Sequence, residues 1–358
     1  MIADFAQEIE SWYRQHGRLL PWRETHDAYR IWVSEIILQQ TRVAQGIDYY
    51  HRFIGRFPDV KALAEATEDE VLRLWQGLGY YSRARNMHRA AQQVMEQGGT
   101  FPQTYEGVRA LKGVGDYTAA AIMSFAYDRP HAVVDGNVFR ILARTQGIDT
   151  PIDTAQGKKM FTALAQELLD RKHPSLYNQA IMDFGAIQCT PKGYQCESCP
   201  LRLTCVACRE GRVEEYPVKS HRVSIRQRHF TYFYIHDKSH LLLRRRGEGD
   251  IWQGLYEMPM VETDKSQSSA QWLKQPWLKH LLAMEAVLTH KASGLHHQLT
   301  HQTISVDFYE ISVPFALEGE QEMDSAGPFL SDYRAVPLAS LDDYGMPKLV
   351  LQLLSMCE

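Results

Sequence analysis

The sequence lacks both a long apolar run and an excess of basic charge. No stretch of about 18 or more apolar residues occurs in the chain, which excludes a membrane-spanning helix. The 358 residues include 39 Lys and Arg residues against 43 Asp and Glu residues, and the formal net charge is −4. A chain of this charge has no general positive field that would attract a polyanion. A nucleic-acid partner would therefore have to be bound through a local feature.

The first residues also lack the features of a targeting segment. They follow neither the basic-then-apolar order of a signal peptide nor the acid-poor, Arg- and Ser-rich composition of a transit peptide. We therefore expect the protein to stay where it is made, in the cytoplasm.

Cysteine is scarce, and the six cysteines are too few for a disulfide scaffold of this length. Four of them lie within 17 residues, in the order Cys189-x6-Cys196-x2-Cys199-x5-Cys205. Four thiolates on one short loop suit either a tetrahedral zinc ion or an iron–sulfur cluster. Zinc ribbons usually present two Cys-x2-Cys pairs and this segment has one, but the spacing alone leaves both metals open.

The composition and the periodicity of apolar residues divide the chain into three parts. Residues 1–205 repeat apolar residues at three- and four-residue intervals between Gly-, Pro- and Asn-rich turns, which predicts a helical domain. Residues 206–224 are polar and are interpreted as a linker. Residues 225–358 contain short segments rich in β-branched and aromatic residues, which are typical of strands. Residues 1–222 have a net charge of +1 and residues 223–358 of −5, so a polyanion would meet the first part.

A glycine-containing turn offers a local feature that can bind a phosphate. In Leu111-Lys112-Gly113-Val114-Gly115-Asp116, the two glycines let the backbone approach an anion closely, and a following helix would point its N–H groups at it. Twenty residues downstream, Asp135 precedes Gly136 and an apolar segment, where it can cap a helix. Either motif alone is a weak signal. The two motifs in this order, followed by the cysteine loop, form a much more specific pattern.

These three motifs resemble the helix-hairpin-helix DNA glycosylases, and the cysteine spacing is similar to the loop that closes their endonuclease III branch. The resemblance implies an all-helical catalytic domain whose 4Fe–4S cluster is held by Cys189, Cys196, Cys199 and Cys205. It also implies that Gly113 and Gly115 contact duplex DNA. A chain of this family is expected to act as a monomer, in association with the bacterial nucleoid.

Three stretches are most similar to the adenine-specific MutY branch, whose members remove adenine mispaired with 8-oxoguanine. They begin at Leu20-Pro21-Trp22-Arg23, at Trp32 and at Gly77. The most specific is Trp32-Val33-Ser34-Glu35-Ile36-Ile37-Leu38-Gln39-Gln40, because endonuclease III relatives do not place a glutamate in that context.

The chemistry of the reaction calls for two carboxyl groups in different environments. One acid protonates the purine so that it leaves, and a negative charge stabilises the sugar, which becomes oxocarbenium-like. Glu35 has apolar neighbours, and enclosure by them would raise its pKa and suit a proton donor. The resemblance implies that Glu35 protonates N7 of adenine and that Asp135 stabilises the sugar cation.

Further site residues follow from the resemblance alone. Tyr117 and Asn137 match positions that support Asp135, and Tyr117 stands where lyase-competent relatives carry a nucleophilic lysine. We therefore expect a monofunctional enzyme. The other matched positions comprise an adenine pocket of Trp22, Arg23 and Gln179, and two residues that probe the duplex, Gln40 and Tyr80.

Residues 225–358 resemble a Nudix-like α/β domain that recognises 8-oxoguanine. The segment after Pro259 lacks the carboxylate-rich helix with which a hydrolytic Nudix domain binds metal, which argues against a pyrophosphatase. The recognition loop of the family carries a Phe-Ser-His-like triplet, and Leu299-Thr300-His301 stands in its place. Thr300 keeps a hydroxyl group, whereas the aromatic residue is missing.

The sequence thus predicts a helical glycosylase domain over residues 1–205, a linker over 206–224 and a Nudix-like α/β domain over 225–358. The expected activity is removal of adenine opposite 8-oxoguanine or guanine in double-stranded DNA. The alternatives are an endonuclease III-like bifunctional glycosylase, against which Glu35 and Tyr117 argue, and a catalytically silent lesion binder, against which the two carboxyl groups argue.

Overall fold

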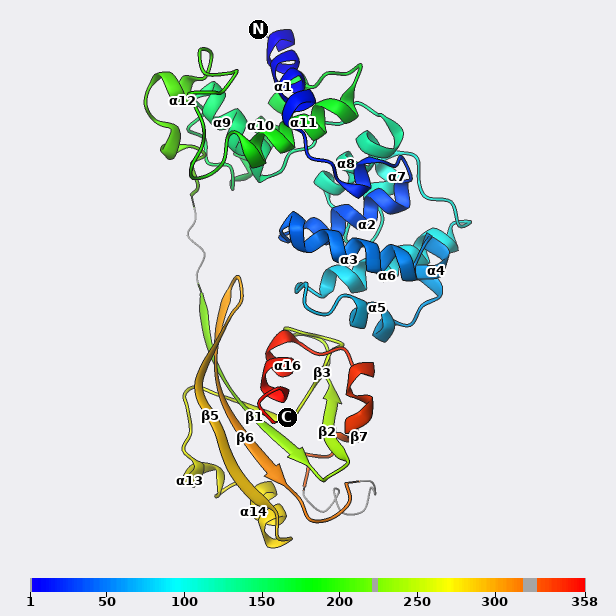
Figure 1. Cartoon of the computed structure of the whole chain (residues 1–358), viewed down its shortest axis with the longest axis vertical. Coiled ribbons are helices and arrows are strands. Elements are labelled where there is room, and N and C mark those ends of the chain that lie inside the picture. Colours follow the sequence, from blue (N-terminus) through cyan, green and yellow to red (C-terminus); the bar gives the residue numbers. More distant parts are fainter. Residues whose placement is uncertain (1, 221–224, 318–326, 358) are drawn as a thin grey trace. The chain divides into compact units, whose positions relative to one another are not determined.

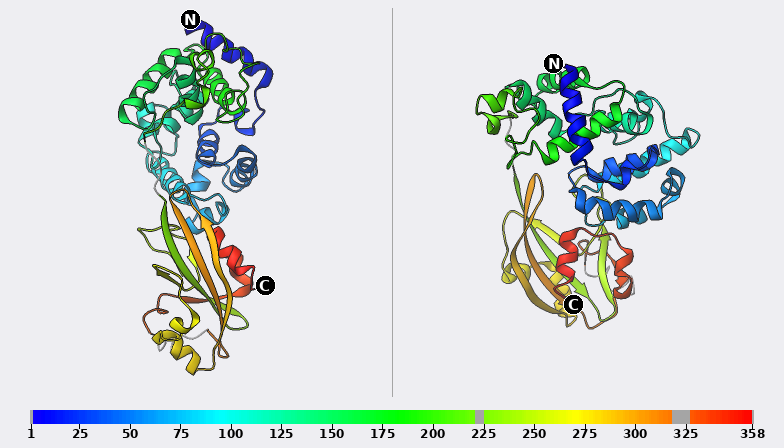
Figure 2. Two further views of the ribbon diagram at one scale, coloured as in Figure 1. Left: turned by 90° about the vertical axis from the view of Figure 1, so that its left-hand side faces the viewer. Right: turned by 45° about the horizontal axis from the view of Figure 1, so that its top comes forward.

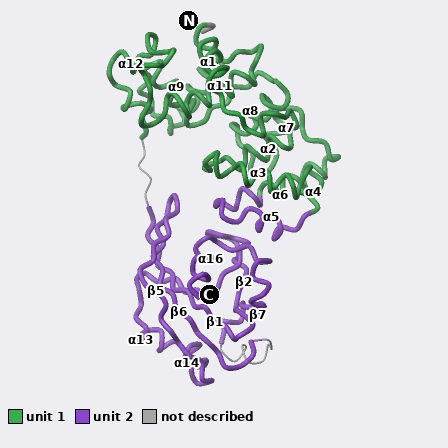
Figure 3. Tube along the Cα trace, in the orientation of Figure 1, with its two compact units in different colours: residues 1–65, 86–222 green, residues 66–85, 223–358 purple. Residues whose placement is uncertain are grey.

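The chain forms two units, each with its own core. In the computed structural model the described residues are 2–220, 225–317 and 327–357. Unit 1 comprises residues 1–65 and 86–222, and unit 2 comprises residues 66–85 and 223–358 (Figure 3). Residues 221–224 of the predicted linker lie outside the described residues.

Unit 1 is built from helices (Figure 1). In chain order they are α1 (Ile2–His16), the short 3-10 helix η1 (Pro21–Arg23), α2 (Ala28–Leu38), α3 (Val43–Arg56), α4 (Val60–Glu65), α6 (Ser82–Glu96), α7 (Tyr105–Arg109), α8 (Asp116–Tyr127), α9 (Gly136–Gln146), α10 (Ala155–Leu168), α11 (Pro174–Ile187), α12 (Val206–Arg209) and the 3-10 helix η2 (Val213–Glu215). Helix α6 begins in the segment assigned to unit 2 and continues into unit 1.

The predicted hairpin joins α7 to α8. Gly113 has φ +76°, and a Cβ atom there would lie 2.6 Å from Cβ of Asn86, so only glycine fits this turn. Gly115 is the N-cap of α8, and no described side chain caps that end of the helix. The first N–H groups of α8 are therefore left for another acceptor.

Helix α9 begins at the predicted acid. The Asp135 side chain accepts hydrogen bonds from the N–H groups of Asn137 and Val138, as an N-cap does. Helix α11 packs tightly against this end of α9, because a Cβ atom on Gly185 would lie 2.5 Å from Cβ of Asn137. Glycine at position 185 thus lets α11 approach Asp135.

Residues 206–216, predicted to begin a linker, instead complete the core of unit 1. Ala207, Val213 and Tyr216 are buried there, and Arg144 donates from Nε to the carbonyl oxygens of Val213 and Tyr216 at 3.0 and 3.3 Å. The few apolar residues of this polar segment are all used in packing, which its average composition conceals.

Unit 2 contains a seven-stranded mixed sheet. Its strands are β1 (Arg226–His236), β2 (His240–Arg245), β3 (Tyr256–Glu257), β4 (Met260–Thr263), β5 (Val287–Gln298), β6 (Gln302–Ser312) and β7 (Arg334–Pro337). The order is β3-β2-β1-β6-β5, with β4 paired to β1 and β7 to β2. Strands β1 and β6 are parallel, and the other pairs are antiparallel.

Helices cover both faces of this sheet, as the two views of Figure 2 show. On one face, α16 (Lys348–Leu354) packs its apolar side chains with those of β1, β2 and β6. On the other face lie α13 (Ser269–Trp272) and α14 (Pro276–Ala283), with Trp272 and Trp277 against Phe233. The 3-10 helix η3 (Leu338–Asp343) follows β7.

Residues 66–85, including α5 (Glu68–Leu74), belong to unit 2, whereas the sequence placed them in the first domain. Arg245 pairs with Glu68 at 2.8 Å and with Asp69 at 2.9 Å. Arg85 donates to the carbonyl and side-chain oxygens of Gln253. These contacts join residues far apart in the chain, which periodicity does not reveal.

The predicted fold class, a helical domain followed by an α/β domain, is confirmed. None of the helices in the described part of the chain has the length and apolarity needed to cross a bilayer.

Candidate active site

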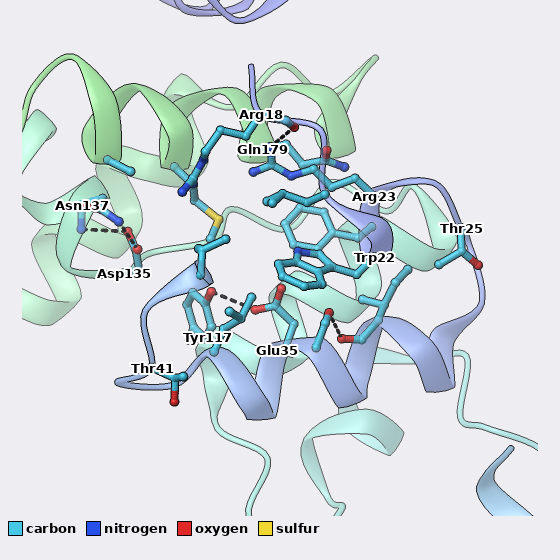
Figure 4. A pocket seen from close by; sticks show the side chains of 18 of the residues that line it. Arg18, Trp22, Arg23, Thr25, Glu35, Thr41, Tyr117, Asp135, Asn137 and Gln179 are labelled. Carbon is cyan, nitrogen blue, oxygen red and sulfur yellow. Dashed lines mark hydrogen bonds between the residues drawn. The ribbon is translucent and has the colours of Figure 1, made fainter. Parts of the chain in front are cut away.

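One pocket in unit 1 brings together seven of the predicted residues (Figure 4). They come from five parts of the chain: the η1 turn, α2, α8, the start of α9 and α11. They are Trp22, Arg23, Glu35, Tyr117, Asp135, Asn137 and Gln179.

Glu35 lies on α2 and is 5% exposed. Burial raises its pKa to about 7, the nearby Asp135 carboxylate adds to the rise, and the Tyr117 hydrogen bond and the Arg23 charge oppose it. Tyr117 donates from its hydroxyl group to Oε2 of Glu35 at 2.8 Å. Burial also raises the pKa of Tyr117 well above its usual range, so this tyrosine remains a donor. Glu35 is therefore poised to carry a proton near neutral pH.

Asp135 is held differently. Its Oδ1 atom accepts from the N–H groups of Asn137 and Val138 at 2.9 and 2.8 Å, and its Oδ2 atom accepts from Nδ2 of Asn137 at 2.8 Å. Burial raises the pKa of Asp135, while these three hydrogen bonds lower it because they stabilise the ionised form. Arg140 in turn donates to Oδ1 of Asn137 at 2.8 Å, which fixes the orientation of that amide.

An aromatic side chain and an amide side chain also line the pocket. The Trp22 ring is buried and packs edge-on against Tyr50. Gln179 on α11 accepts from the Tyr13 hydroxyl group and donates to Ser175, each at 3.2 Å. A flat apolar face beside polar groups suits a purine base.

The sequence analysis missed two residues of this site, Asp183 and Arg18. Asp183 on α11 is fully buried and receives hydrogen bonds from both Arg18 and Arg23. Asp183 lies four residues after Gln179, on the same face of the helix. The sequence did hold a signal for Asp183, because it stands between the apolar residues Met182 and Phe184. An aspartate in such a core position is rarely buried without a charged partner.

The two residues predicted to probe the duplex share an unusual backbone conformation. Gln40 has φ +56° and Tyr80 has φ +49°, in the left-handed region that disfavours side chains. Gln40 is exposed in the turn after α2, between Leu38 and Thr41, which both line the active-site pocket. Gln40 itself does not line that pocket. Strain of this kind often marks functional positions.

Tyr80 lines a second pocket, which lies in unit 2, with Trp252, Thr300 and His301. Its hydroxyl group is hydrogen-bonded to Oγ1 of Thr300. Thr300 sits in the turn between β5 and β6, where the Leu299 N–H group donates to the Gln302 carbonyl oxygen at 2.8 Å. The residues before this turn, which include His290, His296 and His297, form strand β5.

The four predicted cysteines line one pocket of unit 1, and Cys208 lines it as well. Burial raises the pKa values of Cys196, Cys199 and Cys205, and the neighbouring sulfur atoms raise them further. Several thiolates this close together would repel one another. A cation is therefore needed for all of these thiols to ionise. Arg144 contributes one positive charge, donating from Nη1 to Sγ of Cys189 at 3.4 Å.

The spacing of the sulfur atoms is wider than a zinc site requires. Among the described residues, the one group of three metal-binding side chains with ligand atoms within 4.8 Å of one another contains no cysteine. Four ligands roughly 2.3 Å from a single zinc ion would lie about 3.8 Å apart. Four thiols on one loop are a donor set that iron–sulfur clusters use.

Among the described residues of unit 2, no three His, Cys, Asp or Glu side chains bring their ligand atoms within 4.8 Å of one another. Glu262, one of the acids after Pro259, is instead paired with Arg228 at 2.6 Å.

The family models match both parts of the chain. Residues 33–170 match the HhH-GPD superfamily base excision DNA repair protein, and residues 231–356 match the NUDIX domain. Among solved structures, a thermostable thymine-DNA glycosylase is similar with a TM-score of 0.55 and 27% identity, over 58% of this chain and 97% of that one.

Relatives cover nearly the whole chain. The adenine DNA glycosylase of Buchnera aphidicola subsp. Schizaphis graminum is 31% identical over 356 residues, which is 98% of this chain and 97% of that protein. The adenine DNA glycosylase of Mus musculus is 44% identical over 217 residues, covering 58% of this chain and 42% of that protein. The predicted family is thereby confirmed, and the chain belongs to the adenine DNA glycosylases, enzymes of base-excision repair.

Proposed function

We propose that this glycosylase hydrolyses the N-glycosyl bond of adenine mispaired with 8-oxoguanine, or with guanine, and leaves an abasic site. The carrying observation is the pair of carboxyl groups in one pocket, with Glu35 buried against Tyr117 and Asp135 held by three hydrogen bonds. The family membership supports adenine as the base that is removed.

The two acids have separate roles in the proposed mechanism. Adenine is first swung out of the duplex, at a cost of about a few kcal/mol, and enters the pocket beside Trp22. Protonated Glu35 donates its proton to the base, N7 being the expected acceptor, so that adenine leaves as a neutral molecule. The Asp135 carboxylate stabilises the positive charge that develops on the sugar while water attacks C1′. The proton from that water goes to Glu35, which restores the enzyme.

A lyase step would need an amine nucleophile in the active-site pocket, and position 117 holds a tyrosine. The Tyr117 hydroxyl group, protonated and bound to Glu35, stands where a lyase-competent relative would carry an amine. Lys112 is exposed in the hairpin turn, where its N–H group donates to Gln93, and it does not line the active-site pocket. This supports a monofunctional enzyme.

A labelled duplex with one adenine opposite 8-oxoguanine tests the proposal. We expect the adenine strand to break only after alkali, because hydrolysis leaves an intact sugar–phosphate chain. Borohydride added during the reaction should trap no covalent protein–DNA adduct, since no Schiff base forms. Breakage without alkali together with a stoichiometric trapped adduct would show a bifunctional enzyme, and an uncleaved adenine strand would show a silent binder.

We propose that duplex DNA is held by a monomer through backbone groups of the hairpin. Gly113 and Gly115 lie directly before α8, whose uncapped N-terminal N–H groups can donate to a phosphate. This mode needs no basic field, in keeping with a net charge of −4. The Buchnera relatives support a bacterial setting, in which we expect the enzyme to work on nucleoid DNA in the cytoplasm.

We propose that Tyr80, Thr300 and His301 read the 8-oxoguanine left opposite the excised base. They line one pocket of unit 2, and the contact between Tyr80 and Thr300 orients the threonine hydroxyl group. That group can both donate to and accept from the edge of an oxidised purine. Gln40, exposed beside the adenine pocket, is proposed to fill space in the opened duplex.

Thr300→Val should weaken discrimination between adenine opposite 8-oxoguanine and adenine opposite guanine. Valine has the shape of threonine without the hydroxyl group, and one lost hydrogen bond corresponds to about a two- to tenfold smaller ratio of single-turnover rates. Thr300→Ser, which keeps the hydroxyl group, is the matched control and should retain the ratio. An unchanged ratio in the valine variant would remove Thr300 from lesion reading.

We propose that Cys189, Cys196, Cys199 and Cys205 hold a 4Fe–4S cluster. When bound, such a cluster would supply the positive charge that lets the crowded thiols ionise, and it would tie their loop to the core. Arg144, which contacts Cys189 and the carbonyl oxygen of Thr190, fixes the start of that loop. Elemental analysis should find four iron and four sulfide per chain, and a Cys199→Ser variant should contain less iron. Zinc in place of iron would refute the assignment.

A further inference from the structure

Asp183 is a buried acid next to the adenine pocket, and the proposed mechanism gives this acid no role. It lies on α11 with no exposed side-chain surface. Its Oδ2 atom accepts from the Arg18 N–H group at 2.9 Å and from Nη1 of Arg23 at 2.7 Å. Its Oδ1 atom accepts from Nε of Arg18 at 2.9 Å and from Nη2 of Arg23 at 2.8 Å. Both oxygens are therefore occupied, by the two guanidinium groups and by the backbone N–H group of Arg18.

Arg23 is held by this acid in one orientation. Both of its terminal nitrogens point to Asp183, and Nη1 also donates to the Arg18 carbonyl oxygen at 3.0 Å. Such a two-pronged pair fixes the plane of a guanidinium group. The Arg23 side chain is only 13% exposed, so water does little to screen its charge.

The same Arg23 stands near the proton donor without pairing with it. Arg23 and Glu35 line one pocket and interact electrostatically, yet Arg23 makes its hydrogen bonds to Asp183 and Arg18, and Glu35 makes its hydrogen bond with Tyr117. In the view of Figure 4, the Trp22 ring lies between the Arg23 and Glu35 side chains. A free guanidinium group this close would attract the carboxylate form of Glu35 and remove the acid that the reaction needs.

We propose that Asp183 is a positioning residue that holds the Arg23 guanidinium group away from Glu35, so that Glu35 keeps the proton it donates to adenine. This inference rests on the proposed function, in which Glu35 is the acid. The pairing with Asp183 also keeps the Arg23 side chain in one position beside the base, so that it does not alternate between Asp183 and Glu35.

Other charged and titratable groups surround Glu35 and stay unchanged in the test. Tyr117 on α8 donates to Glu35, and the Asp135 carboxylate faces it from the start of α9. Arg18 and His26 line the same pocket. A change at position 183 alters the pairing of both Arg23 and Arg18, so the contribution of Arg23 has to be isolated by changing Arg23 as well.

The test is the pH dependence of the single-turnover rate on adenine opposite 8-oxoguanine. Excision requires protonated Glu35, so the rate falls as pH rises through the pKa of Glu35, about 7. In Asp183→Asn, the released Arg23 should pair with Glu35 and lower this pKa, which moves the alkaline fall of the rate to lower pH by about one unit or more. Asp183→Glu, which keeps the charge, should stay close to the parent profile.

A second pair of variants separates positioning from folding. Arg23→Met keeps Asp183 paired with Arg18, and it should move the alkaline fall to higher pH because a positive charge near Glu35 is gone. Asp183→Asn combined with Arg23→Met should cancel the shift of Asp183→Asn. Thermal melting identifies any variant that fails to fold, and Arg23→Met then carries the test alone.

The outcomes are distinct. A profile unmoved in the folded Asp183→Asn and Arg23→Met variants, with a rate lowered equally at every pH, would overturn the inference and leave Asp183 a structural residue. If Glu35→Gln keeps its turnover, the acid assignment itself fails. If Glu35→Gln is inactive while the Asp183→Asn profile stays in place, only the inference fails.

Discussion

Glu35→Gln should lower the single-turnover rate of adenine excision by about a thousandfold or more, while leaving mismatch binding nearly unchanged. Glutamine has the size of glutamate and can still accept the Tyr117 hydrogen bond, so the pocket keeps its shape. It has no proton to donate to the leaving base. Because Glu35 is 5% exposed, water cannot readily take over as the acid.

Rate and affinity must be measured on the same duplex. Binding is followed with a substrate analogue that resists cleavage, and excision is followed by strand breakage after alkali. Glu96→Gln is a suitable control, since Glu96 is exposed on α6 and pairs with Arg89. Turnover in Glu35→Gln close to that of this control would remove Glu35 from the mechanism.

Asp135→Asn should lower the excision rate by at least about a hundredfold with little loss of stability. The negative charge that stabilises the sugar cation disappears, whereas Oδ1 of asparagine can still accept from the N–H groups of Asn137 and Val138. Asparagine and aspartate are about equally good N-caps, so α9 should remain intact.

Asp135→Ala separates the two roles of this residue. It removes both the charge and the cap, so it should lose the same activity and in addition about 0.5–2 kcal/mol of unfolding free energy. Chemical denaturation of the three proteins measures this difference. Equal stability of the alanine and parent proteins would mean that Asp135 does not cap α9 in solution, and full activity of the asparagine variant would refute its role in catalysis.

Local chemistry made much of this site predictable from the sequence. Glu35 among apolar neighbours, Asp135 before a helix and four closely spaced cysteines each carry a signal within a few residues. Resemblance added Tyr117 and Trp22, and the structure places both in the pocket with Glu35. Short segments rich in β-branched and aromatic residues also indicated that the second domain contains strands.

The rest depended on contacts between distant segments. Asp183 was not predicted because its role depends on its pairing with Arg18 and Arg23, which are 165 and 160 residues away in the sequence. Residues 66–85 read as ordinary helical sequence, and their assignment to unit 2 depends on contacts with distant residues such as Arg245 and Thr300. Periodicity reports which face of a helix is apolar but not which segment covers it.

The left-handed backbone at Gln40 and Tyr80 has a consequence for engineering this enzyme. Each residue adopts φ near +50°, a conformation that costs a residue with a side chain roughly 1–2 kcal/mol and glycine very little. Glycine at either position would therefore look favourable in any screen that ranks variants by melting temperature. Such a screen would reward the loss of the two side chains we assign to inspecting damaged DNA, and thermostabilised versions should be selected by mutation-avoidance assays in cells instead.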